Sequence, residues 1–85
     1  MKYPVVMRRT NTGFCVEVPD LPVCVSTGET FEAALANIQE AILLHLEGLR
    51  EDGEPIPNPT PSLAVRIDQG DDIVTYVDVG EKQAA

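Results

Sequence analysis

The sequence predicts a single α+β domain in which one long helix packs on a small mixed sheet. A stretch at 31–51 repeats apolar residues with helical spacing, and short runs rich in β-branched residues lie before and after it. The chain has 85 residues, enough for one sheet face and one covering helix, and its apolar content of 44% is that of a globular domain. We expect one domain over residues 1–80 and a frayed tail at 81–85.

The region before the helix is expected to form a β-hairpin and a short third strand. Two β-prone runs, 3–9 and 14–18, are joined by the turn-forming segment Thr-Asn-Thr-Gly. Pro19 is expected to stop the second run and Pro22 to turn the chain. A short extended segment at 23–26 then leads to the helix.

The helix itself is predicted over residues 31–51. Thr30 is a suitable N-cap and Gly53 a suitable C-terminal stop. The residues that share its apolar face are Phe31, Ala34, Leu35, Ile38, Ala41, Ile42, His45, Leu46 and Leu49. Leu43 and Leu44 fall outside this face, so they are either covered by the following segment or form a contact surface.

The segment after the helix is expected to return the chain to the sheet. Its prolines alternate in EPIPNPTP, which neither a helix nor a central strand tolerates, so it is predicted to be an extended surface connector. The stretch 62–68 fits either a strand or a helical turn that begins at Ser62. The β-branched run 73–79 is expected to be the last strand. The predicted order is therefore β-β-(β)-α-β.

No catalytic or metal-binding constellation is evident in the sequence. His45, the single histidine, lies on the apolar helix face, where packing explains it better than general-base catalysis. Cys15 and Cys24 are too few for a disulfide framework and are expected to be buried free thiols, and with one histidine they do not make a zinc site. The adjacent acid pairs at 51–52 and 71–72 are typical of solvated loops. We expect no cofactor, no metal and no enzymatic activity.

The net charge of −8 is unevenly distributed. Residues 1–28 carry three basic and two acidic side chains, a sum of +1, whereas residues 29–85 carry three basic and twelve acidic ones, a sum of −9. Such a surface repels nucleic-acid phosphates and favours a basic partner, although acidity also serves solubility alone. No apolar run is long enough to span a membrane, and the N-terminus lacks a secretory signal, so a cytoplasmic protein is expected.

Binding is the favoured type of function. The first and last strands leave sheet edges that a second chain could extend, which predicts a homo-oligomer, a dimer or a tetramer. Leu43 and Leu44 are the leading candidates for a contact surface. We add to the predicted partner-binding residues Asp20 and Leu21, from the stretch PDLPVC, and Glu47, which lies on the polar side of the helix.

Five stretches of the sequence form a combined pattern: 3–6, 13–24, 26–30, the alanine-rich helix start and 51–57. Together they resemble the HicB-like antitoxin family. The family pattern is an aromatic start, a hairpin, P-D-L-P-G-C, an S-x-G-[DE]-T corner, the helix, and E-D-G-x-x-I-P. In this chain Val23 stands where the family has glycine, and Ala33 replaces a common glutamate. The match covers residues 3–61 well and the last strand less specifically.

The resemblance implies both a fold and a function. The implied fold is a β-β-β-α-β ribonuclease-H-like core that has lost its catalytic carboxylates. The implied function is that of an antitoxin, which binds a small basic HicA-like mRNA-cleaving toxin and denies RNA access to the toxin's catalytic histidine. Many family members add a C-terminal DNA-binding domain. This chain stops shortly after the predicted last strand, so we expect no direct binding of nucleic acid.

Two other functions remain open on the sequence alone. One is an orphan oligomeric module of the same fold, which binds another protein or a small ligand and has no toxin partner. The other is a vestigial hydrolase that uses Asp20 in metal-dependent RNA cleavage. A short basic protein encoded in the neighbouring reading frame would favour the antitoxin.

Overall fold

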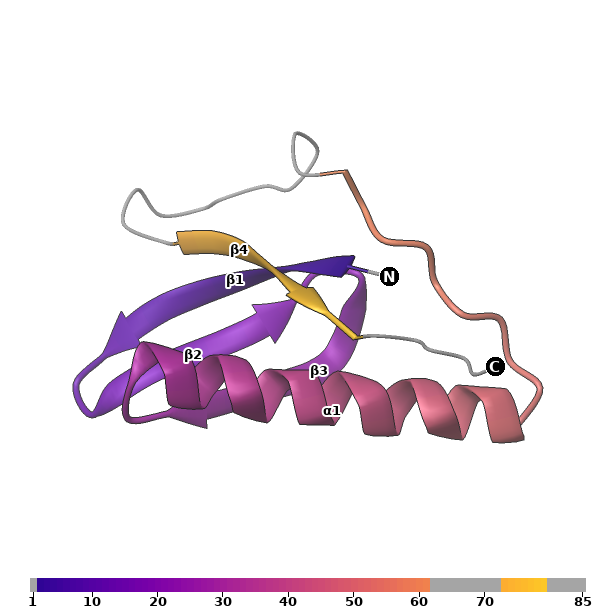
Figure 1. The fold of residues 1–85 in the computed structure, drawn as a ribbon, viewed down its shortest axis with the longest axis horizontal. Coiled ribbons are helices and arrows are strands. Elements are labelled where there is room, and N and C mark those ends of the chain that lie inside the picture. The colour runs from indigo at the N-terminus through magenta and orange to yellow at the C-terminus, as the bar shows by residue number, and fades with distance from the viewer. Residues whose placement is uncertain (1, 62–72, 80–85) are drawn as a thin grey trace.

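The fold is an antiparallel four-stranded sheet with one long helix against it (Figure 1). The computed structural model describes residues 2–61 and 73–79. Its elements are β1 (Lys2–Thr10), β2 (Gly13–Val18), β3 (Leu21–Gly28), α1 (Phe31–Glu51) and β4 (Ile73–Asp78). The strand order across the sheet is β3-β2-β1-β4. The predicted succession β-β-β-α-β and the single long helix are confirmed.

The prediction of a mixed sheet is wrong, because all three strand pairs are antiparallel. The reason lies in where β4 begins. Ile73 pairs with Met7 near the end of β1, and Asp78 pairs with Lys2 at its start. β4 therefore begins beside the end of β1 and runs against it.

The corner between β2 and β3 differs from the prediction. Val18 pairs with Leu21 across a two-residue turn, whereas Glu17 pairs with Val25, so residues 22–24 have no counterparts on β2 and form a bulge. Pro22 thus lies inside β3 instead of turning the chain, and the third strand is longer than the predicted 23–26. A proline is tolerated there because a bulge on an edge strand requires no ladder hydrogen bond from it.

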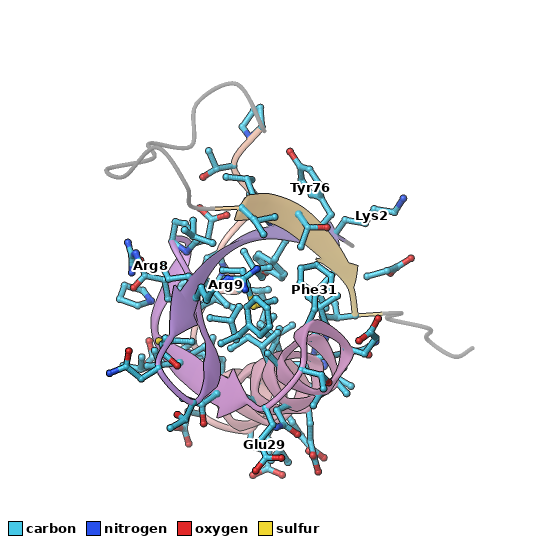
Figure 2. All side chains as sticks on the ribbon, turned by 90° about the vertical axis from the view of Figure 1, so that its left-hand side faces the viewer. Lys2, Arg8, Arg9, Glu29, Phe31 and Tyr76 are labelled. Atoms are coloured by element: carbon cyan, nitrogen blue, oxygen red, sulfur yellow. The ribbon has the colours of Figure 1, made fainter. Side chains whose placement is uncertain are left out.

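The core lies between the sheet and α1. Viewed along the helix, the strands curve around the apolar side chains and α1 closes the open side (Figure 2). The fully buried helix residues are Ala34, Ile38, Ile42 and Leu46, and those of β1 that face them are Tyr3, Val5 and Met7. The predicted apolar face of the helix is confirmed, with His45 half-buried at its margin.

Both ends of α1 are stopped as the sequence predicts. The Thr30 side chain accepts a hydrogen bond from the Ala33 N–H at 3.0 Å, which satisfies one of the free donors of the first turn. At the other end Gly53 has a φ of +71°, a conformation that favours glycine, and its N–H donates to the Arg50 carbonyl.

The proline-rich connector is extended, as predicted, and is fixed to the domain at three points. Ile56 packs against the core. The Tyr3 hydroxyl donates to the Pro57 carbonyl at 2.5 Å. The Thr60 N–H donates to Asp20 at 2.7 Å, and the Thr60 hydroxyl donates to the same carboxylate. The prediction for 62–68 and that for the tail lie outside the described residues.

Gly28 allows the end of β3 to touch the first turn of α1, which generates a stability prediction. A Cβ at this position would collide with the Ala34 N and lie 2.7 Å from the Ala34 Cα. Gly28→Ala should therefore lower the free energy of unfolding by about 1–3 kcal/mol in urea denaturation, the usual cost of overpacking. The exposed neighbour gives the control, Thr27→Val, which should stay within about 0.5 kcal/mol of wild type. A neutral Gly28→Ala would contradict this account of the strand–helix contact.

Candidate partner-binding surface

The structure places the five residues predicted for partner binding in two separate regions. One region is the β2–β3 turn, where Asp20 lies in the turn and Leu21 is the first residue of β3. The other is the outward half of α1, which carries Leu43, Leu44 and Glu47. Leu21 is only 1% exposed and belongs to the core. Leu43 and Leu44 are 43% and 62% exposed. The exposed candidates are therefore those on the helix.

Asp20 serves an internal contact in this structure. Its two carboxylate oxygens accept the hydrogen bonds from Thr60 described above, which join residues 40 positions apart in the sequence. The sequence shows that Asp20 follows a predicted strand, but no local pattern indicates that Thr60 is its partner. The pairing depends on the path of the connector, which brings Thr60 to Asp20. We call this pair the Asp20–Thr60 latch.

An acidic ridge with one leucine runs along the outer side of α1. Glu40, Leu43 and Glu47 are all exposed and follow one another at spacings of three and four residues, so they share one side of the helix. We call these three residues the α1 crest. Glu40 was not among the residues predicted for partner binding. Its spacing of three residues from Leu43 and seven from Glu47 could have placed it on the same side of the helix.

The two exposed leucines point to different flanks of the helix. The Gln39 side chain donates to the Asp78 carbonyl at 2.8 Å, which places its flank beside β4, and Leu43 follows one turn later. The Asn37 side chain donates to the Thr27 carbonyl at 2.8 Å, which places the opposite flank beside β3, and Leu44 follows two turns later. One partner contact is therefore not expected to use both leucines equally.

Basic side chains of the described residues lie mainly on β1, away from the crest. The Arg8 guanidinium contacts the Glu17 carboxylate at 3.1 Å, and Arg9 lies 5.5 Å from the centre of the Phe14 ring (Figure 2). The crest thus presents two carboxylates around a half-exposed apolar side chain. Such an arrangement suits a basic protein surface, because the acids attract it and the leucine can anchor it.

The structure offers little for catalysis or metal binding. Among residues 2–61 and 73–79, no three His, Cys, Asp or Glu side chains are grouped so that they could hold a metal ion. A hollow of about 230 Å³ lies beside the β1–β2 turn. It is lined by Thr10, Thr12, Phe14, Thr27, Gly28 and Glu29, which include no histidine or cysteine. No helix of the described chain is long and apolar enough to cross a membrane.

The thiols differ in environment. Cys24 is buried and its Sγ lies 4.0 Å from the Ala41 carbonyl oxygen, whereas Cys15 is only half-buried, which corrects the prediction that both are buried. The difference follows from the pleat, because Cys15 and Arg8 face each other on the side of the sheet away from α1. Burial raises the pKa of the Cys24 thiol.

A comparison with known proteins agrees with the geometry. The model of a family described as the HicB-like antitoxin of bacterial toxin–antitoxin systems matches residues 3–84. The chain belongs to this family. The HicB-like family is non-enzymatic, which confirms the expectation of no enzymatic activity.

Solved structures extend the comparison to three dimensions. The N-terminal domain of antitoxin HicB from Burkholderia pseudomallei is 30% identical, with a TM-score of 0.81 over 93% of this chain and 98% of that one. A HicB chain from a HicA3–HicB3 toxin–antitoxin complex is also 30% identical, with a TM-score of 0.75 over 92% of this chain and 96% of that one. The predicted family and the α+β fold class with one long helix are confirmed, while the sheet is antiparallel instead of mixed.

A longer relative comes from a bacteriophage. An uncharacterized 14.9 kDa protein encoded in the rep-hol intergenic region of Haemophilus phage HP1 is 43% identical over 81 residues. The match covers 93% of this chain and 61% of the phage protein, so the chain spans less than two thirds of that relative's length.

The Asp20–Thr60 latch should be measurable as a coupling energy. Asp20→Ala removes the accepting carboxylate, and Thr60→Val removes the donating hydroxyl. A double-mutant cycle on the free energy of unfolding in urea should therefore give a coupling energy of about 0.5–1.5 kcal/mol between the two positions. The exposed connector residue Asn58 provides the control, since Asp20→Ala and Asn58→Ala should be additive within about 0.5 kcal/mol. If the latch pair is additive too, Asp20 does not fix the connector.

The two thiols should react at different rates and respond differently to pH. The single-thiol variant Cys24→Ser, which keeps Cys15, should be modified by a disulfide reagent much faster than Cys15→Ser, which keeps Cys24. Above the ordinary thiol pKa of about 8.5 the unfolded chain loses a proton that folded Cys24 retains, so stability should fall as the pH rises. Cys24→Ala should lack this part of the decline. Equal modification rates would contradict the burial of Cys24.

Proposed function

We propose that the protein is a cytoplasmic antitoxin that neutralises a HicA-like mRNA-cleaving toxin by direct contact. The observation that carries the proposal is the likeness to the HicB chain of the HicA3–HicB3 complex, which extends over 92% of this chain. It is supported by the family match over residues 3–84 and by the acidic surface of the molecule. The partner is a small basic protein.

The proposed contact is the α1 crest. A protein that cleaves RNA must present basic side chains to the phosphates, and the Glu40 and Glu47 carboxylates offer the same charge as a phosphate. Both lie on a rigid helix, which presents them without a prior ordering step. Leu43, between them, supplies apolar area that can be buried when the acids are paired. A toxin held in this way has its RNA-binding surface covered.

Electrostatic attraction also predicts how the complex responds to salt. Exposed charge pairs are screened within about 10 Å at 0.1 M ionic strength. The association rate with a basic partner should therefore fall as salt is added, while the apolar contact of Leu43 is less affected. Such a profile would fit an acidic binding surface and would not fit a purely apolar one.

Charge reversal on the crest tests the proposal. The product of the neighbouring reading frame, which the proposal expects to be a small basic protein, is purified and its affinity for this chain is measured by calorimetry. The variants are Glu40→Lys/Glu47→Lys and Leu43→Glu, and each should weaken binding at least about tenfold, equivalent to 1.4 kcal/mol. Glu54→Lys on the exposed connector reverses a single charge away from the crest and should bind like wild type.

Two results would count against the proposal. Normal binding by both crest variants would place the contact elsewhere on the domain. The absence of any basic partner, with no binding of HicA-like proteins, would favour the orphan oligomeric module that binds another protein or a small ligand.

A further inference from the structure

We infer that Asn37 and Gln39 act together as positioning residues, which hold the α1 crest in the direction that a partner meets. The Asn37 side-chain amide donates to the Thr27 carbonyl of β3 at 2.8 Å. The Gln39 side-chain amide donates to the Asp78 carbonyl of β4, also at 2.8 Å. We call these two residues the carboxamide clamp. The inference deepens the proposed antitoxin function and rests on it, because the crest is the proposed contact with the toxin.

The two clamp residues divide α1 into an inner and an outer face. Successive residues of a helix are about 100° apart around its axis, so Asn37 and Gln39 are separated by about 200° on one side and about 160° on the other. The wider, inner arc contains the buried residues of the helix, which are Ala34, Ile38, Ile42 and Leu46. The narrower, outer arc contains the crest. The crest therefore faces away from the sheet between two points of attachment.

Both acceptors belong to the frame of the sheet. β3 and β4 are the outermost of the described strands, so carbonyls on their outer edges lie beyond the ladder of strand pairs. Thr27 is paired with Cys15 of β2, and on the other side of the sheet β4 is paired with β1 as far as Asp78. Each acceptor is thus held in place by strand pairing. The clamp ties the helix to both edges of one rigid sheet.

The clamp adds direction to a contact that is otherwise apolar. Burial of apolar area turns one face of the helix inward, but it is non-directional, whereas a hydrogen bond weakens steeply when it is stretched or bent. Because the two bonds lie on opposite flanks, rotation of the helix in either direction stretches at least one of them. Neither carboxamide titrates, so these bonds do not depend on pH in the way that an ion pair does.

A fixed crest lowers the free-energy cost of binding. Glu40 follows Gln39 directly in the chain, and Glu47 lies two turns further, about 12 Å along the helix axis. Both carboxylates therefore move with the clamped part of the helix. A surface that is already oriented loses less freedom when a partner binds. Loss of the clamp should weaken binding although no crest residue has changed.

Isosteric substitutions separate the clamp from simple charge. Asn37→Asp and Gln39→Glu each replace the donating amide by a carboxylate, which cannot donate to a carbonyl, and each adds one negative charge. Attraction to a basic protein alone predicts tighter binding by both variants, whereas the clamp predicts weaker binding. The matched control is Ala36→Glu, because Ala36 is exposed within the outer arc and makes no clamp contact.

Affinity for the product of the neighbouring reading frame is the first readout, measured by calorimetry. Ala36→Glu is expected to tighten binding about two- to threefold. Asn37→Asp and Gln39→Glu are each expected to weaken it about threefold or more. Tighter binding by all three variants would show that charge alone matters and would overturn the clamp. A wild type that binds no basic protein would count against the proposed function, and the second readout then decides the clamp alone.

Residual dipolar couplings of the free, intact chain are the second readout. The backbone N–H couplings of α1 report its tilt and rotation relative to the strands. They are expected to change, or to average toward smaller values, in the double variant Asn37→Asp/Gln39→Glu and to stay unchanged in Ala36→Glu. Circular dichroism should show that the helix is retained in both. An unchanged helix orientation in the double variant would overturn the inference, since any loss of binding would then not come from the direction of the crest.

Discussion

Burial of one face of α1 inside the curved sheet is the interaction on which the rest of the structure depends. Ile38, Ile42 and Leu46 are at most 1% exposed, and each such side chain contributes about 1.5–3 kcal/mol when removed from water. This burial fixes the rotation of the helix about its axis. The rotation in turn decides that Leu43 faces the β4 side and Leu44 the β3 side. The proposed contact surface is therefore a consequence of the core.

The stretch PDLPVC combines several structural roles in six residues. The Asp20 carboxylate accepts a hydrogen bond from Thr60 of the connector, and Leu21 is buried in the core. In the bulge that follows, Val23 is exposed whereas Cys24 is buried. A catalytic interpretation is unnecessary for these residues, because each has a structural contact or position that accounts for it. The exposure of Val23, where the family pattern has glycine, adds apolar surface to the edge of β3.

Local patterns predicted the parts of the fold that depend on local physics. The helix bounds, the Thr30 cap and the apolar face followed from periodicity and capping chemistry, and the hairpin followed from its turn residues. Strand direction did not follow, because it depends on where β4 begins after a long connection. The Asp20–Thr60 latch was equally inaccessible, since no local rule relates residues 40 positions apart. Of the predicted contact residues, Leu21 shows the limit most clearly: an apolar residue in a turn motif can belong to the core or to the surface.

Neutralisation of RNA cleavage is the most direct test of the account. A HicA-like protein, sought first in the neighbouring reading frame, is incubated with an RNA substrate while the purified chain is titrated in. The account predicts that cleavage falls in proportion to the added chain and ceases near equivalence, and that Glu40→Lys/Glu47→Lys protects the RNA far less than Glu54→Lys. Undiminished cleavage in the presence of a saturating amount of the wild-type chain would contradict it.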